Sequence, residues 1–187
     1  MKNFILASKS PRRIELLKQI GYKPKEIISS NIAETPLKKE LPKDFVLRMA
    51  VEKAKDVHSK YPNDYVLGAD TIVVFGRKIL QKAYSDEDVK NFLKALSGRR
   101  HRVYTGICLI SLDSKISKKI VETIVKFKRL DNLDIKEYTK SKEGLEKAGG
   151  YAIQGLGGAF VSWISGSYSN VVGLPLYETR NLLKLVK

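Results

Sequence analysis

The decapeptide FILASKSPRR, residues 4–13, passes from an apolar run directly into the start of a helix. Its first four residues have the length and apolar character of a buried strand. Ser10 stands at an expected helix N-cap, and Pro11 takes the first helical position, where a missing N–H does no harm. The helix then runs to Gly21, a typical C-terminal stop. The decapeptide therefore predicts a strand-loop-helix unit.

Outward from this unit, strand-like and helix-like segments alternate, with no repeat and no low-complexity linker. The pattern predicts further strands at residues 66–70, 71–75, 79–80, 103–111, 120–129, 151–154 and 159–164. It predicts further helices at residues 44–59, from Ser85 to Gly98, from a capping pair of Asp134 and Glu137, and at residues 174–185. Such alternation indicates an α/β fold of the mixed α+β type.

Length and cysteine content narrow the class of protein. The 187 residues suffice for one compact domain, or for two small lobes that share a sheet, and we take residues 1–187 as a single catalytic domain. No apolar run approaches the roughly 18 residues of a membrane helix, and the first apolar run is too short for a secretory signal. The single cysteine, Cys108, reads as an apolar strand residue. These features predict a soluble, cytoplasmic protein with no membrane partner.

The chain is strongly basic. Its 35 Lys and Arg against 20 Asp and Glu give a formal net charge of +15, which favours anionic ligands. Nucleic acid is the obvious candidate, but the basic residues are spread along the chain and match no zinc finger, RNA-recognition motif or basic zipper. We therefore predict no nucleic-acid partner. We interpret the excess charge as solvated lysine that also helps a polyanionic substrate to bind.

The loop and helix start of the decapeptide are suited to phosphate. A helix N-terminus exposes unpaired N–H groups and the positive end of its dipole. Arg12 and Arg13 add charged donors, and two hydroxyls, those of Ser8 and Ser10, complete a set that suits a triphosphate. An ordinary capped helix with surface arginines explains the same residues, and the local chemistry leaves both interpretations open.

Two carboxylates are candidates for metal and proton chemistry. Asp70 follows an apolar strand and a Gly-Ala pair, at a point where the chain is expected to turn or open. There it can hold Mg²⁺ or deprotonate an attacking water, and Thr71 beside it can donate or accept a hydrogen bond. A turn aspartate that caps its own backbone is the alternative. Glu34 lies in a polar loop that favours a solvated side chain, and it matters only as a second metal ligand.

Three further polar side chains stand in informative positions. Lys53 shares the apolar stripe of its helix, so it must either snorkel to solvent or find an anion. Lys82 follows an apolar strand end and either reaches a phosphate or is a surface lysine. Gln154 stands in a glycine-rich bend, where its amide either reads a base edge or hydrogen-bonds the loop. The sequence has no Walker loop and no GxGxxG motif, and its histidines lack the spacing of metal ligands. It therefore gives no support for a P-loop, a Rossmann dinucleotide site or a zinc site.

Six ordered motifs resemble the Maf proteins, nucleoside triphosphate pyrophosphatases related in fold to the inosine triphosphatases. They are LAS with SPRR (6–8 and 10–13), GADT (68–71), LSG (96–98), KAG (147–149), YAIQG (151–155) and GSY through GLP (166–175). The resemblance covers nearly the whole chain. It implies an elongated mixed sheet flanked by helices, in two lobes with a central cleft for the nucleotide.

The resemblance also implies roles for the matching residues. Asp70 would be the catalytic acidic residue, and Asp70 and Glu34 would hold a divalent cation, Mg²⁺ or Mn²⁺. The implied triphosphate contacts are Ser8, Arg12, Arg13, Lys53 and Lys82. The residues that accompany a preference for dTTP and UTP in the most similar branch are Arg12, Thr71 and Gln154. The chain departs from the family at Ala83, usually proline, and at Lys9, usually a small residue.

The resemblance therefore predicts hydrolysis of dTTP and UTP, with modified pyrimidine nucleotides in range, to the nucleoside monophosphate and pyrophosphate. Asp70 either orients the attacking water or accepts its proton. The family also implies a homodimer, on which the sequence itself is silent. The alternatives are a pyrophosphatase for modified purine nucleotides, a non-catalytic nucleotide-binding regulator of septum formation, and a basic nucleic-acid-binding module with salt-sensitive affinity.

Overall fold

The computed structural model describes residues 3–186, which fall into two compact units. Unit 1 is built from the residues up to Thr71, from Thr105–Val121 and from the residues that begin at Gly173. Unit 2 is built from Ile72–Tyr104 and Glu122–Val172. The chain passes from one unit to the other inside strands after Thr71, after Tyr104 and after Val121.

Seven strands of the described residues form one sheet. They are β1 (Phe4–Ala7), β2 (Glu26–Ile27), β3 (Tyr65–Phe75), β4 (Lys78–Leu80), β5 (Arg100–Ile110), β6 (Ile116–Phe127) and β7 (Val161–Ser165). Their hydrogen-bonded order is β2-β1-β3-β5-β6-β7, and β4 pairs with β3. β1 runs parallel to β2 and β3, whereas the pairs of β3 with β4 and of β6 with β7 are antiparallel. The predicted mixed α/β class is therefore confirmed.

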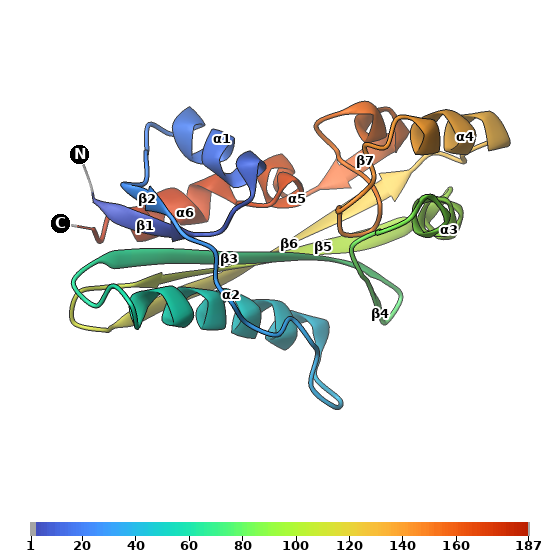
Figure 1. Cartoon of the computed structure of the whole chain (residues 1–187). Coiled ribbons are helices and arrows are strands. Elements are labelled where there is room, and N and C mark those ends of the chain that lie inside the picture. The colour runs from blue at the N-terminus through green and yellow to red at the C-terminus, as the bar shows by residue number, and fades with distance from the viewer. Residues whose placement is uncertain (1–2, 187) are drawn as a thin grey trace. The chain divides into compact units, whose positions relative to one another are not determined.

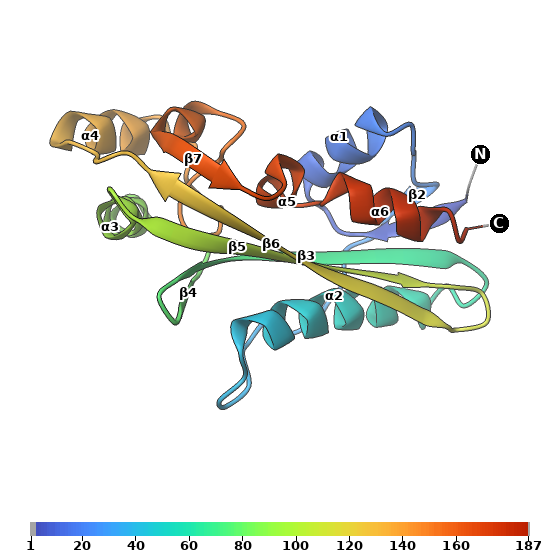
Figure 2. The same cartoon turned by 180° about the vertical axis from the view of Figure 1, so that it is seen from behind.

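Unit 1 has helices on both faces of its strands. They are α1 (Pro11–Gln19), α2 (Pro42–His58) and α6 (Leu176–Leu183). In Figures 1 and 2, α2 lies on one face of the strands, and α1 and α6 lie on the other. All four residues of β1 are buried, as expected of a parallel strand covered on both faces. A core cluster joins α2 to the strands through Ile5, Ala7, Ala50, Ala54, Val57, Val66, Cys108 and Ile110.

Cys108 is an inert part of that core. It is fully buried on β5, as predicted for an apolar strand residue. Burial disfavours the charged thiolate and raises the pKa of Cys108 to about 12. The side chain therefore contributes packing, not nucleophilic chemistry.

Two glycines let α2 approach the strands closely. A Cβ on Gly68 of β3 would lie 2.4 Å from the carbonyl oxygen of Ala50, and a Cβ on Gly106 of β5 would lie 2.6 Å from that of Val46. No real side chain tolerates such distances. The absence of a Cβ at both positions therefore sets the height of α2 above the sheet.

Unit 2 adds the remaining helices. They are α3 (Asp86–Leu96), α4 (Asn132–Lys140), the 3₁₀ helix η1 (Leu156–Phe160) and α5 (Tyr168–Val172). α3 begins with the predicted capping box of Ser85 and Asp88, and it packs against α4. Edge-to-face aromatic contacts join His101, Phe127 and Tyr151 in the core of the unit. Within residues 3–186, no helix is long and apolar enough to cross a membrane.

Four local predictions are wrong in detail. Asp70 does not stand at a turn, because β3 continues unbroken through it into the apolar residues that follow. Residues 151–154 form no strand and lead through a turn into η1. The capping box of α4 consists of Asp131 and Asp134, three residues earlier than predicted. Ser10 occupies the N-cap of α1, but its side chain makes no capping hydrogen bond.

Candidate active site

Asp70 lies in the middle of β3, in a run of buried residues. Its side chain is only 10% exposed, and its Oδ1 accepts a hydrogen bond from Lys53 Nζ at 2.7 Å. A carboxylate this deeply buried needs a compensating charge, and the ammonium group supplies it. Asp70 is therefore a charged group held at a fixed place on a rigid strand.

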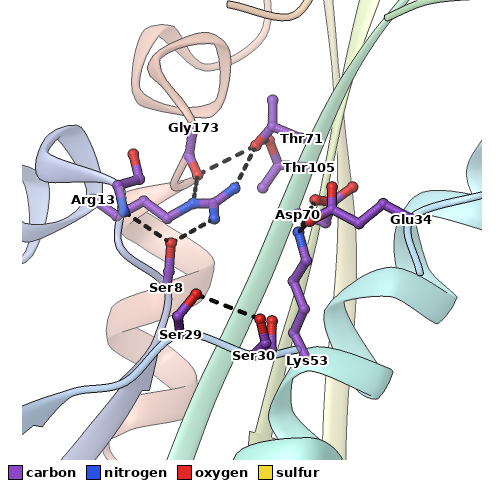
Figure 3. Close-up of polar contacts among 11 residues, drawn as sticks. Ser8, Arg13, Ser29, Ser30, Glu34, Lys53, Asp70, Thr71, Thr105 and Gly173 are labelled. Atoms are coloured by element: carbon purple, nitrogen blue, oxygen red, sulfur yellow. Dashed lines mark hydrogen bonds and ion pairs between the residues drawn. The ribbon is translucent and has the colours of Figure 1, made fainter. Parts of the chain in front are cut away.

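Lys53 bridges two carboxylates. It lies on α2 with 9% of its side chain exposed, and its Nζ is 2.7 Å from Asp70 Oδ1 and 2.8 Å from Glu34 Oε1 (Figure 3). Of the two alternatives for Lys53, snorkelling to solvent or pairing with an anion, the structure shows the second, and both anions are side chains of this chain. Glu34 comes from the loop before α2, and its side chain is 43% exposed. The loop, the helix and β3 thus each contribute one member of a charged cluster.

Arg13 is the buried centre of a second group of contacts in unit 1. Its Nε donates to the carbonyl oxygen of Gly173 at 2.9 Å, its Nη1 to Ser8 Oγ at 2.9 Å, and its Nη2 to Thr71 Oγ1 at 3.2 Å (Figure 3). These bonds use three of the five N–H donors of a guanidinium, which leaves two for an anionic ligand. Arg13 is therefore no surface arginine.

Burial also changes the pKa of Arg13. Desolvation lowers the pKa of Arg13 from its usual value, and the negative charge of Asp70 is the largest effect that opposes this shift. A guanidinium still stays protonated in proteins. The Asp70 carboxylate and the Arg13 cation thus stabilise each other electrostatically, which links the two groups of contacts.

Thr71 follows Asp70 in β3 and connects three segments of the chain. Its Oγ1 lies 2.9 Å from Thr105 Oγ1 on β5, and it donates to the carbonyl oxygen of Gly173 at 3.3 Å. Sequence reasoning missed Thr105, which lies in no motif. It also missed the use of the Gly173 carbonyl, although Gly173 belongs to the recognised GLP motif.

The structure brings together in unit 1 the predicted site residues Ser8, Arg13, Glu34, Lys53, Asp70 and Thr71. Arg12, half-buried on α1, carries a positive charge that further lowers the pKa of Arg13. Two predicted residues belong to unit 2 and are exposed there. Lys82 pairs with Ala148 in an isolated antiparallel bridge, and Gln154 lies in the turn before η1.

The donor chemistry of the charged cluster fits a hard divalent cation. Asp70 and Glu34 offer carboxylate oxygens, and Mg²⁺ in nucleotide enzymes is commonly held by one or two carboxylates together with substrate phosphates. Among residues 3–186, no group of three or more His, Cys, Asp or Glu side chains could hold a metal on its own. The set therefore suits a cation that arrives with phosphate oxygens as further ligands.

Comparisons with known proteins show which proteins this chain is similar to. A family model described as Maf-like protein matches residues 3–186. A dTTP/UTP pyrophosphatase of Wolbachia sp. subsp. Drosophila simulans is 54% identical over 184 residues, which cover 98% of this chain and 93% of the relative. One of Sphingopyxis alaskensis is 52% identical over 186 residues, which cover 100% and 97%. A HAM1 protein from Coxiella burnetii shares the fold, with a TM-score of 0.54 at 15% identity over 98% of this chain and 99% of its own.

Proposed function

Because the chain belongs to the Maf-like protein family, we propose that it hydrolyses dTTP and UTP to the nucleoside monophosphate and pyrophosphate. The observation that carries the proposal is the cluster of Glu34, Lys53 and Asp70 in unit 1, next to the buried cation of Arg13. Two carboxylates and two cations are the parts that metal-assisted phosphoryl chemistry needs. The names of relatives at 52% to 54% identity supply the substrate.

In this mechanism Asp70 acts on the water that attacks the α-phosphorus. One carboxylate oxygen of Asp70 either orients that water or accepts its proton. Mg²⁺ or Mn²⁺, held by Asp70 and Glu34, would stabilise negative charge on the phosphate oxygens. The attack breaks the bond between the α-phosphorus and its bridging oxygen, and pyrophosphate leaves.

The cations of the site neutralise the leaving pyrophosphate. Lys53 has three N–H donors, and its two ion pairs use two of them, which leaves one for a phosphate oxygen. Arg13 has two N–H donors left. Preorganised donors of this kind supply most of the rate enhancement in phosphoryl transfer.

The remaining predicted roles extend the proposal. We assign Ser8, Arg12 and Lys82 to the triphosphate, and we assign the preference for a pyrimidine base to Arg12, Thr71 and Gln154. The match of the family model to residues 3–186 supports one catalytic domain over residues 1–187. We also propose a homodimer, which the family resemblance implies, and a cytoplasmic location, as the sequence analysis predicts.

The direct test is the variant Asp70→Asn. It keeps the shape of the side chain but removes its charge, so we expect release of pyrophosphate from dTTP to be abolished while circular dichroism still shows a folded protein. Asp64→Asn is the matched control, because it removes the carboxylate of another lysine pair in unit 1, that of Lys25 with Asp64 at 2.6 Å. Turnover by Asp70→Asn at the level of the control would refute the assignment.

A substrate panel tests the base preference of the same protein. We expect turnover of dTTP and UTP to exceed that of ITP and methylated GTP. The reverse order would identify a pyrophosphatase for modified purines. Tight nucleotide binding with no turnover in the presence of Mg²⁺ or Mn²⁺ would identify a non-catalytic regulator.

A further inference from the structure

The hydroxyl of Thr71 has no hydrogen-bonding capacity left for a substrate. A hydroxyl donates one hydrogen bond and accepts two. Arg13 can only donate, so its Nη2 at 3.2 Å uses one acceptor site of Thr71 Oγ1. The carbonyl of Gly173 can only accept, so Thr71 donates its proton there at 3.3 Å. A hydroxyl has one proton, so when Thr71 donates to Gly173, Thr105 Oγ1 at 2.9 Å is the donor to Thr71 and fills its second acceptor site.

The carbonyl oxygen of Gly173 likewise has no acceptor site left. It accepts from Arg13 Nε at 2.9 Å and from Thr71 Oγ1 at 3.3 Å, which uses both of its lone pairs. Gly173 has a φ of +130°, a conformation that glycine adopts easily and other residues rarely do. Arg13, Thr71 and Gly173 thus form a closed ring of hydrogen bonds. The hydrogen bond from Thr105 fixes which way the Thr71 hydroxyl points within this ring.

Thr105 belongs to this ring but stands outside the charged cluster. It is 0% exposed on β5, and its hydroxyl lies 2.9 Å from the hydroxyl of Thr71 (Figure 3). A fully buried partner cannot be exchanged for solvent, so loss of the Thr105 hydroxyl frees an acceptor site of Thr71 that water does not readily refill. The proton of Thr71 can then turn, which weakens the hydrogen bond that Thr71 accepts from Arg13 Nη2, whereas Nε and Nη1 of Arg13 keep their partners.

We propose that Thr105 is a positioning residue of the active site. Its hydroxyl fixes the hydrogen bonds around Thr71 and thereby holds the Arg13 guanidinium, whose two remaining N–H donors bind the phosphates of the substrate. The inference rests on the proposed function and changes one of its assignments: Thr71 acts on the phosphates through Arg13, and the contacts that select a pyrimidine base fall to Arg12 and Gln154.

The test removes one hydroxyl at a time. Thr105→Val deletes the donor and keeps the branched shape, and we expect the KM for dTTP to rise about five- to tenfold, the size of one net hydrogen bond, with kcat changed less than about twofold. Thr105→Ser restores the hydroxyl and should bring the KM back to near the wild-type value. Thr179→Val is the matched control, because Thr179 of α6 is fully buried and its hydroxyl has no partner among the described residues.

A double-mutant cycle distinguishes positioning from general packing. If Thr105 acts through Thr71, adding Thr105→Val to Thr71→Val changes the KM by less than about twofold, because the partner is already gone. An equal rise of the KM in both backgrounds overturns the inference, and so does a wild-type KM in Thr105→Val alone. If Thr105→Val does not fold, Thr105→Ala takes its place in the same cycle.

Failure of the proposed function gives a different result. A wild-type protein that turns over no nucleotide refutes the function, and the same variants are then compared for dTTP binding by calorimetry. Weaker binding by Thr105→Val, restored in Thr105→Ser, still supports the positioning role. Equal affinities of wild type and Thr105→Val overturn it.

Discussion

At the scale of single residues, Lys53 occupies the place between two carboxylates where a cation is expected. Its ammonium lies 2.7 Å from Asp70 Oδ1 and 2.8 Å from Glu34 Oε1, so its positive charge repels a metal cation bound to the other oxygens of the same carboxylates. We expect Lys53→Met to tighten the binding of Mn²⁺ in the absence of nucleotide at least about tenfold, because a positive charge at contact distance is removed. Turnover of dTTP should fall in the same variant.

Free Mn²⁺ measured by electron paramagnetic resonance checks this prediction independently of activity. Lys60→Met is the control, since Lys60 pairs with Asp56 at an exposed place, and its loss should leave Mn²⁺ binding unchanged. Unchanged affinity in Lys53→Met would mean that the two carboxylates do not hold the metal.

His101 makes the stability of the protein depend on pH. It is 2% exposed, and burial lowers the pKa of His101 from 6.5 to about 4. The unfolded chain therefore binds a proton between these values that the folded chain does not, so stability is full above pH 6.5 and falls as the pH drops towards 4. The loss amounts to about 3 kcal/mol. Urea unfolding of wild type and His101→Gln across this range should show a smaller pH dependence in the variant, and equal slopes would contradict the assignment.

The sequence predicts single residues where a local pattern carries the information. Lys53 interrupts an apolar helical stripe, so its inward direction is visible in the sequence, and the structure confirms it. Arg13 follows an ordinary helix start, and its burial depends on a carbonyl 160 residues later in the chain. Thr105 gives no signal at all, because a threonine in a strand is what β-propensity alone would place there.

At the scale of elements, the closeness of α2 to β3 sets the distance between Lys53 and Asp70. Gly68→Ala puts a Cβ 2.4 Å from the Ala50 carbonyl, so α2 must move away from β3. We expect a loss of about 2 kcal/mol in the free energy of unfolding, as for an overpacked core. Activity of the folded variant should fall as well, because the Lys53 pair with Asp70 spans these two elements.

Gly98→Ala is the control for this prediction. Gly98 has a φ of +70°, and its nearest neighbour to a new Cβ is 3.9 Å away, so only the backbone is strained. Alanine should cost about 1 kcal/mol of stability there and leave kcat/KM unchanged. Chemical denaturation and dTTP turnover of both variants check the pair, and a Gly68→Ala protein with wild-type kcat/KM would contradict the link between helix position and site.

Helices and strands were predictable where the sequence pattern of apolar residues matches the burial in the structure. The apolar start of β3 and its continuation are both visible, but Asp70 between them suggested a break. Within the continuous strand Lys53 neutralises the buried carboxylate, and that pairing is invisible in the local sequence. The largely apolar residues 151–154 have the pattern of a strand. Tyr151 is buried through side-chain contacts, such as that of its hydroxyl with His101 Nε2 at 2.7 Å, and not through strand pairing.

At the scale of the whole molecule, the motifs identify the fold better than periodicity does. Strands β3, β5 and β6 each contribute residues to both units, an arrangement that no local pattern predicts. The ordered motifs nevertheless implied a mixed sheet flanked by helices, which the structure confirms. The net charge also belongs to the whole molecule, because it arises from lysines and arginines along the entire chain.

The formal charge of +15 should assist the encounter with a polyanionic nucleotide. We expect kcat/KM for dTTP to fall about tenfold between about 50 and about 500 mM potassium chloride, because screening weakens long-range attraction, while kcat at saturation stays within about twofold. Inhibition by dTDP is the control, since its smaller charge should give a weaker salt dependence. A flat kcat/KM would show that the excess charge is solvated lysine without influence on the substrate, and that the buried cations of unit 1 alone account for phosphate binding.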